Sequence, residues 1–308
     1  MKKKIFVTGS NGLLGQKLIY ALLNRSDFEI FATSKGENRL MKKDGYTYQS
    51  LDITDKSAVE NLFKLYLPDV VVNTAAMTNV DACETQRDEC WKINVTAVKN
   101  IIDASEKIKA RKQVHLIHLS TDFVFDGKNG PYKEEDKPNP LSYYALSKNE
   151  SEKIVQDSHI KWAILRTIII YGVVDNMSRS NLVLWAKDAL SKGQKINVVD
   201  DQFRSPTLAE DLADACIRVT ERGAEGIYHI SGKETMSILE IVYKVADFFK
   251  LDKLLVNPVK SNTLNQPAKR PPTTGFIIDK AIRDLGYHPH SFEEGLKVVA
   301  EQLSKIKK

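Results

Sequence analysis

The sequence predicts a doubly wound, parallel α/β sheet with a smaller, discontinuous C-terminal domain. Short apolar segments alternate with helical patterns, a glycine-rich turn follows the first segment, and the alternation becomes irregular after residue 172. Strands that alternate with helices at this interval run parallel, with helices on both faces of the sheet. We expect residues 1–171 and 207–231 to form the sheet domain and residues 172–206 and 232–308 to form the smaller one.

The elements follow one another in a regular order through most of the chain. The expected strands are Lys4–Thr8, Phe28–Thr33, Tyr46–Leu51, Asp69–Asn73, Val114–Leu119 and Trp162–Gly172, and Ile227–Ile230 rejoins the same sheet. The expected helices are Gln16–Leu23, Asp55–Leu67, Glu84–Lys109, one that carries Tyr144 and Lys148, and Ala209–Glu221. In the smaller domain we expect helices at Ser180–Leu190, Ile238–Phe249 and Phe292–Leu303, a strand at Lys195–Val199 and a loop at Asp200–Thr207.

The turn after the first strand predicts a dinucleotide site. Gly9, Gly12 and Gly15 have the spacing G-x-x-G-x-x-G between a strand and a helix. Glycines there let the backbone approach a pyrophosphate, which then lies at the positive N-terminus of the helix. The turn residues that we expect to contact the cofactor are Gly9, Asn11, Gly12, Leu13 and Leu14. Ala75 and Ala76 follow a later strand, and their small side chains would let the cofactor lie flat.

The residues after the second strand indicate which dinucleotide is bound. An acidic residue there would hold the adenosine ribose of NAD. This chain has Ser34 and Lys35 instead, with Arg39 close behind. A hydroxyl and two cations suit a 2′-phosphate, which favours NADP(H) over NAD(H). Glu37 lies in the same loop and keeps NAD(H) open.

Tyr144 is the candidate proton donor, and Lys148 is the residue expected to adjust the pKa of its phenol. Residues at i and i+4 share one face of a helix, so phenol and ammonium can point to one spot. A nearby ammonium favours the phenolate, so we expect Lys148 to lower the pKa of Tyr144. Such a pair can donate a proton to a carbonyl while another group delivers hydride. Most Y-x-x-x-K pairs are ordinary helix-surface residues, so the neighbouring motifs decide whether this pair is catalytic.

The composition excludes several other classes of function. The chain has 308 residues and a formal net charge of +5, and much of that charge comes from lysines at its two ends. No basic stripe with interleaved aromatic residues is present, so we expect no nucleic-acid binding. No apolar run approaches the roughly 20 residues that a membrane span requires. The chain passes from Lys4 straight into a strand, and we therefore expect no cleavable signal.

Cysteine and histidine usage points to a cytoplasmic protein without a metal site. Cys83, Cys90 and Cys216 form no C-x-x-C spacing and leave one cysteine unpaired in any disulfide scheme. Reduced thiols are typical of the cytoplasm. The six histidines show no metal-ligand spacing. A monomer and a homodimer are both compatible with the sequence.

Taken in order, these motifs resemble the extended short-chain dehydrogenase/reductase superfamily. The resemblance rests on the glycine turn, Asp52-Ile53, Asn73–Ala76, Ser120-Thr121, and Tyr144 with Lys148. Within that superfamily the chain is most similar to the dTDP-4-dehydrorhamnose reductase family. The segments that carry this narrower resemblance are Ser120–Gly127, Asp201–Thr207, Arg270–Pro272 and Met77–Asp81. The fold that this implies is the Rossmann fold.

The resemblance implies an NAD(P)H-dependent reductase of a nucleotide-activated 4-keto-deoxysugar. Hydride would go to the keto carbon and Tyr144 would supply the proton, while Lys148 binds the nicotinamide ribose. Thr121, with Ser120 as the alternative, would hydrogen-bond the carbonyl oxygen. Asp52 and Ile53 would hold the adenine. The residues implied at the substrate are Thr78, Val80, Asp122 and, for the diphosphate, Arg204.

Departures from the family pattern keep the substrate open. Phe123 replaces a tyrosine, Ala145 replaces a glycine, and Ile168-Ile169-Ile170 stands where a tryptophan is common. One alternative is an epimerase or dehydratase on a similar sugar, although no pair of acids accompanies Thr121. Another is a non-catalytic regulatory protein that resembles the beta subunit of methionine adenosyltransferase and binds a partner protein. The joint presence of Thr121, Tyr144 and Lys148 favours an active enzyme.

Overall fold

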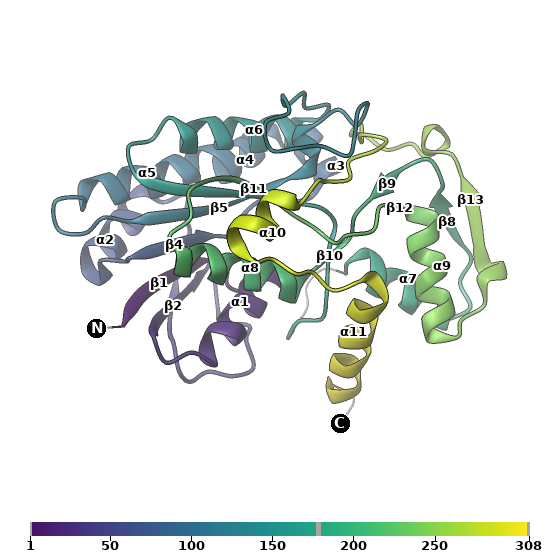
Figure 1. The fold of residues 1–308 in the computed structure, drawn as a ribbon, viewed down its shortest axis with the longest axis horizontal. Helices are drawn as coiled ribbons and strands as arrows, with labels where there is room; N and C mark the ends of the chain where they lie inside the picture. The colour runs from purple at the N-terminus through teal and green to yellow at the C-terminus, as the bar shows by residue number, and fades with distance from the viewer. Residues whose placement is uncertain (1, 177–179, 307–308) are drawn as a thin grey trace.

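The computed structural model describes residues 2–176 and 180–306 and contains a seven-stranded parallel sheet with helices on both faces (Figure 1). Its strands, in spatial order, are β11 (Gly226–Ile230), β6 (Lys161–Thr167), β5 (His115–Thr121), β4 (Val70–Asn73), β1 (Lys3–Thr8), β2 (Phe28–Ser34) and β3 (Thr47–Ser50). Every neighbouring pair in this sheet is parallel. The predicted fold class is confirmed.

The order of the strands fixes where a ligand can bind. From β1 the chain adds β2 and β3 on one side, and then crosses over to add β4, β5, β6 and β11 on the other. The strand order therefore reverses between β1 and β4. Sheets of this kind bind ligands at the carboxyl ends of the strands at such a reversal.

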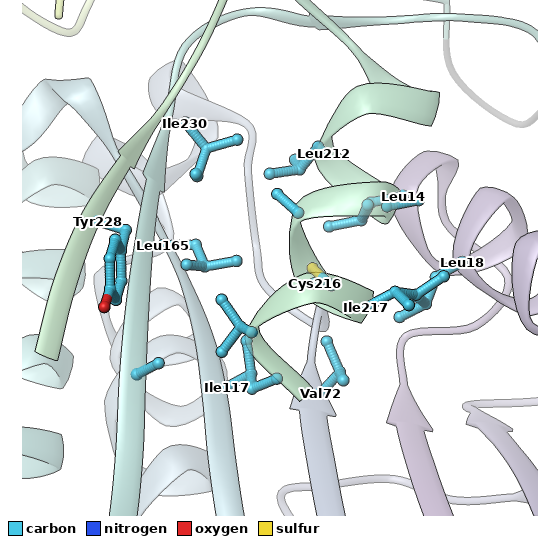
Figure 2. Packing of buried hydrophobic residues seen from close by; sticks show 14 of the residues in the cluster. Leu14, Leu18, Val72, Ile117, Leu165, Leu212, Cys216, Ile217, Tyr228 and Ile230 are labelled. Carbon is cyan, nitrogen blue, oxygen red and sulfur yellow. The ribbon is translucent and has the colours of Figure 1, made fainter. Parts of the chain in front are cut away.

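Two layers of helices bury the two faces of the sheet. One face is covered by α1 (Leu13–Leu23), α8 (Ala209–Arg222) and α10 (Asp279–Leu285), and the other by α2 (Lys56–Tyr66), α5 (Ala97–Lys107) and α6 (Tyr143–Gln156). Figure 2 shows the first layer, where Leu14 and Leu18 of α1 and Leu212 and Cys216 of α8 approach the strands. The central strands are apolar on both sides because both faces are covered.

A second core lies beside the sheet, on the side of β8, β13, α7 and α9 in Figure 1. Its helices are α7 (Leu182–Ser191), α9 (Ile238–Phe249) and α11 (Phe292–Ile306), and its strands form the pairs β8 (Ile196–Val199) with β13 (Val256–Val259), β9 (Phe203–Arg204) with β12 (Met236–Ser237), and β7 (Ile170–Tyr171) with β10 (Thr207–Leu208). Residues Phe276 to Tyr287 pack with the core of the sheet instead. The division into two domains stays a prediction.

Three local expectations from the sequence need correction. The segment expected as one helix over Glu84–Lys109 is helical over most of its length, but it is divided among the end of α3 (Val80–Thr85), α4 (Arg87–Trp91), a π-helical turn (Lys92–Thr96) and α5. The strand expected to continue to Gly172 ends at Thr167, because Ile169 adopts a positive φ of 26° and turns the chain into β7. The segment Asp200–Thr207 is not only a loop, since it contains β9 and the start of β10. All three depend on contacts with distant segments, which local periodicity does not encode.

Candidate active site

The glycine turn between β1 and α1 has the shape that a pyrophosphate requires. Gly9 has a φ of +67°, and a Cβ at Gly15 would lie 2.4 Å from the Gly9 carbonyl oxygen. The cap residue of α1 is Gly12, and no side chain caps the helix. The first backbone N–H groups of α1 therefore remain available to an anion, as they are at other phosphate-binding helix N-termini.

Two adjoining cavities extend from this turn. The larger has a volume of about 530 Å³ and is lined by the turn, the end of β5 and the first turns of α6. The smaller, of about 320 Å³, lies beside the loop after β2. All predicted cofactor residues line one or both of them: Gly9, Asn11, Gly12, Leu13, Leu14, Ser34, Lys35, Arg39, Asp52, Ile53, Ala75, Ala76, Tyr144 and Lys148. The shape and the residues fit a dinucleotide.

Charged groups surround the smaller cavity. Lys35 Nζ lies 2.9 Å from Asp52 Oδ2, and this contact is the main reason that the pKa of Asp52 is lowered to about 2. Asn11 holds the loop, because its side chain donates to the Glu37 carbonyl (2.8 Å) and accepts from the Arg39 N–H (2.9 Å). Lys35 and Arg39 therefore line the same cavity, the one that we expect to hold the adenosine half of the cofactor.

Tyr144 projects into the larger cavity from the first turn of α6. Ser142 caps this helix by accepting from the Ala145 N–H at 3.3 Å, which favours helix start at Tyr143. Burial raises the pKa of the Tyr144 phenol well above its ordinary value of 10, and a hydrogen bond with Thr121 offsets only part of that effect. The predicted lowering of this pKa by Lys148 is therefore wrong for the side chains of this structure. A raised pKa keeps the phenol protonated, as a proton donor must be.

Lys148 lies one turn further along α6 and is also buried. Its Nζ donates to the Leu119 carbonyl at 2.6 Å and lies 3.3 Å from His118 Nε2. Burial lowers the pKa of Lys148 to about 8, against the opposing effects of Glu152 and Cys90. Among the described side chains no hydrogen bond joins Lys148 to Tyr144 directly. The ammonium is held by β5 instead, which explains why it does not tune the phenol.

Arg204, the predicted diphosphate partner, lies elsewhere than expected. The side chain is fully buried and outside the lining of both cavities. Its guanidinium donates to the carbonyls of Phe203 (2.7 Å), Pro271 (2.6 Å) and Pro272 (3.1 Å), and it lies 3.6 Å from Asp122. With its donors engaged in this way, Arg204 cannot reach a diphosphate. The structure assigns it the positioning of Asp122 and of the loop before Thr273.

The other predicted substrate residues lie at the larger cavity. Thr78, Val80 and Asp122 line it beside Thr121 and Phe123. Asp122 is buried, and its carboxylate accepts hydrogen bonds from Thr121 and Thr274. Its pKa is raised by burial, with the Arg204 charge opposing.

Several residues of the site had no contact role predicted from the sequence. Asn94, in the π-helical turn, accepts from the Met77 N–H (2.8 Å) and donates to Ser147 Oγ (3.0 Å), so it joins the loop after β4 to α6. Such turns often mark functional sites, but nothing in the local sequence distinguishes this one from regular helix. The segment between β6 and α7, together with the start of α7, also lines the larger cavity, through Ile169, Ile170, Val174, Ser180, Asn181 and Leu182. Ile169 and Ile170 belong to the run at which the sequence departs from the family pattern.

Three further observations concern membrane spans, metal ions and disulfides. No helix among residues 2–176 and 180–306 is long and apolar enough to cross a membrane. The same residues contain no group of three or more His, Cys, Asp or Glu side chains that could hold a metal ion. The three cysteines are buried and form no disulfide.

A glycine-turn cleft at the strand reversal, leading to Thr121, Tyr144 and Lys148, defines the class: the chain is an NAD(P)-dependent oxidoreductase of the short-chain dehydrogenase/reductase type. Comparison with known families gives a match to the RmlD substrate binding domain over residues 2–305. The chain belongs to this family.

The proteins that this chain is similar to include both reductases and regulatory subunits. The dTDP-4-dehydrorhamnose reductase of Aggregatibacter actinomycetemcomitans is 30% identical over 306 residues, which cover 96% of this chain and 97% of the relative. Methionine adenosyltransferase 2 subunit beta of Rattus norvegicus is 31% identical over 301 residues, which cover 96% and 86%. Among solved structures, the dTDP-4-dehydrorhamnose reductase of Bacillus anthracis in complex with NADP has a TM-score of 0.85 at 30% identity, covering 98% of this chain and 100% of that chain.

Proposed function

We propose that this protein reduces the keto group of a nucleotide-activated 4-keto-deoxysugar with NADPH. The observation that carries the proposal is the placement of Thr121, Tyr144 and Lys148 on one wall of the cavity that begins at the glycine turn. The relatives named dTDP-4-dehydrorhamnose reductase support this substrate class. A product of this kind, such as dTDP-rhamnose, would serve the synthesis of cell-surface polysaccharides.

The side chains of the site can divide the work of carbonyl reduction. A bound nicotinamide supplies the hydride. Tyr144, kept protonated by burial, donates a proton to the carbonyl oxygen as negative charge develops there. Thr121 hydrogen-bonds that oxygen and orients the phenol. Lys148, with a pKa near 8, carries its charge at neutral pH and holds the ribose beside the nicotinamide.

The walls of the two cavities support the finer assignments. Lys35 and Arg39 provide positive charge where a 2′-phosphate would lie, which favours NADP(H) over NAD(H). Val80, Phe123 and Ile169 provide an apolar surface beside Tyr144, which suits a sugar carbon without its hydroxyl. Thr78 and Asp122 remain the proposed polar contacts to the sugar.

The test is NADPH oxidation by the purified full chain with a panel of dTDP-, UDP- and GDP-linked 4-keto-6-deoxysugars. Tyr144→Phe should lower kcat by roughly 100- to 10,000-fold and leave the Kd of NADPH within about threefold. Tyr143→Phe is the matched control, because that ring packs against Trp91 and lies outside the lining of the cavity. Equal turnover by the Tyr144 variant would refute the proposed acid.

The relatives named methionine adenosyltransferase 2 subunit beta define the second candidate function. In that case the chain would act as a regulatory partner of another protein rather than as a reductase of nucleotide-activated sugars. The same assay separates the two functions. Tight NADPH binding without turnover of any sugar in the panel would favour the regulatory role and overturn the reductase.

A further inference from the structure

A row of buried polar side chains crosses the sheet just below its carboxyl edge. Thr33 of β2, Thr8 of β1, Asn73 of β4 and His118 of β5 occupy matching register positions on four adjacent parallel strands. Each of the four is 1% exposed. Side chains two residues apart on a strand share a face. The residues two positions earlier pack under α2, α5 and α6: Phe31, Phe6, Val71 and Leu116. The polar row therefore points to the face that α6 covers.

Hydrogen bonds along this row have a definite direction. Thr8 Oγ1 donates to Asn73 Oδ1 at 2.6 Å, a distance typical of O–H···O. The Asn73 oxygen therefore faces Thr8, and its amide nitrogen faces His118 Nδ1 at 3.2 Å. That ring nitrogen must accept, so the ring proton of His118 lies on Nε2.

The protonated edge of His118 faces α6. Nε2 lies 3.0 Å from Ser151 Oγ, and Ser151 already donates its own proton to the Lys148 carbonyl at 2.7 Å. Ser151 therefore accepts from Nε2–H. Lys148 Nζ lies 3.3 Å from the same nitrogen and cannot donate to it, so its hydrogen bond goes to the Leu119 carbonyl. The imidazole closes one side of the ammonium and leaves its other N–H bonds to the cavity.

We propose that His118 is a positioning residue for Lys148, and that Thr8 and Asn73 set the tautomer of its ring from the neighbouring strands. The proposal rests on the function proposed above, in which Lys148 binds the nicotinamide ribose. It extends the machinery of the site from α6 through β5 to β4 and β1. Thr8, Asn73 and His118 are buried and each is hydrogen-bonded to the next, so these three residues form one connected network. Thr33 lies in the same row, but its hydroxyl bonds to the Val7 carbonyl instead.

The ionisable groups around Lys148 determine how the row affects its titration. They are His118 on β5, Cys90 on α4, and Tyr144 and Glu152 on α6 itself. His118 stays neutral, because burial and the charge of Lys148 hold its pKa well below the ordinary value. Its N–H edge turns a positive dipole end toward the ammonium and so disfavours the charged form. Reversal of the tautomer would present a lone pair instead, and the pKa of Lys148 would rise.

Thr8→Val tests this reversal without a change in side-chain shape. Without the hydroxyl, the Asn73 amide can turn over, accept from His118 Nδ1–H, and free Nε2 to accept from Lys148. Thr33→Val is the matched control: this threonine is equally buried in the same row, but its hydroxyl donates to the Val7 carbonyl at 3.2 Å. Nitrogen–proton NMR correlations of ¹⁵N-histidine-labelled protein report the tautomer, and the His118→Leu spectrum identifies the signals.

We expect Nε2–H in the wild type and in Thr33→Val, and Nδ1–H in Thr8→Val. The alkaline limb of kcat should move upward by roughly one pH unit in Thr8→Val alone, because a charged hydrogen bond favours the ammonium. His118→Leu should lower kcat by about tenfold or more, with KM for the sugar within about threefold. An Nδ1–H tautomer in the wild type, or equal spectra and pH profiles for the two threonine variants, would overturn the proposal.

The role of His118 can be tested even if the protein reduces none of the sugars. The tautomer requires no substrate, and the pH dependence of the NADPH Kd reports Lys148 directly. If no sugar is reduced but the tautomer reverses in Thr8→Val and the alkaline limb of NADPH binding moves with it, the proposed function fails and the polar row stands. If sugars are reduced normally and the tautomer is unaffected by Thr8→Val, the row fails and the proposed function stands.

Discussion

Replacement of Lys148 by methionine should stabilise this protein at neutral pH while abolishing its activity. Burial lowers the pKa of Lys148 from 10.5 to about 8. The difference of 2.5 units corresponds to about 3 kcal/mol, at 1.36 kcal/mol per unit. Loss of the hydrogen bond to the Leu119 carbonyl destabilises the variant by about 1 kcal/mol and offsets part of this gain. Methionine has a similar length and no charge, so we expect a net gain of about 2 kcal/mol in the free energy of unfolding at pH 7.

The sign of this effect depends on pH. Below pH 8 both the folded and the unfolded chain hold the proton, and the folded state bears the full cost of the buried charge. Between pH 8 and 10.5 only the unfolded chain holds it, so unfolding takes up a proton and wild-type stability rises with pH. The advantage of Lys148→Met should therefore be present at pH 7 and shrink steadily toward pH 10.

Urea denaturation at pH 7, 8, 9 and 10 measures this difference. Lys153→Met is the control, because that lysine lies on the same helix, is solvent-exposed and pairs with Glu150 at the surface. Its stability relative to the wild type should not change across the same pH range. The reasoning is refuted if Lys148→Met is less stable than the wild type at pH 7, or if its advantage is the same at pH 7 and pH 10.

Two further predictions concern the cofactor loop and the buried ion pair behind the site. Arg39→Ala should raise the Kd of NADPH by roughly tenfold and leave that of NADH within about twofold, because a charged hydrogen bond to the 2′-phosphate is lost; equal changes for both cofactors in a fluorescence titration would contradict the assignment. Glu152 accepts from Arg166 at 2.7 Å, and both side chains are nearly inaccessible. Glu152→Gln should lower the free energy of unfolding by about 3–5 kcal/mol, because it leaves a buried guanidinium without its counter-charge; a loss below about 1 kcal/mol in urea denaturation would show that the pair contributes little.

Local sequence patterns predicted much of the fold. Strands and helices of the sheet region follow from short apolar runs and helical periodicity, and the turn at Gly9 follows from glycine spacing. The placement of Tyr144 and Lys148 one turn apart on a single helix also follows from their spacing of four residues. These features depend on neighbours within a few residues, which a single sequence displays directly.

The features that the sequence did not predict depend on contacts between residues that are far apart in the chain. Sequence alone predicted the class of sheet and the glycine turn, and it singled out Thr121, Tyr144 and Lys148 as candidate site residues. Only the tertiary structure decided that Arg204 is buried against Pro271 and Pro272, and that Lys148 is held by β5 rather than aimed at the phenol. A local pattern can state that a charged side chain is present. Whether it meets solvent, a ligand or a buried carbonyl is decided by segments that come together only on folding, because burial and hydrogen-bond partners set its energy.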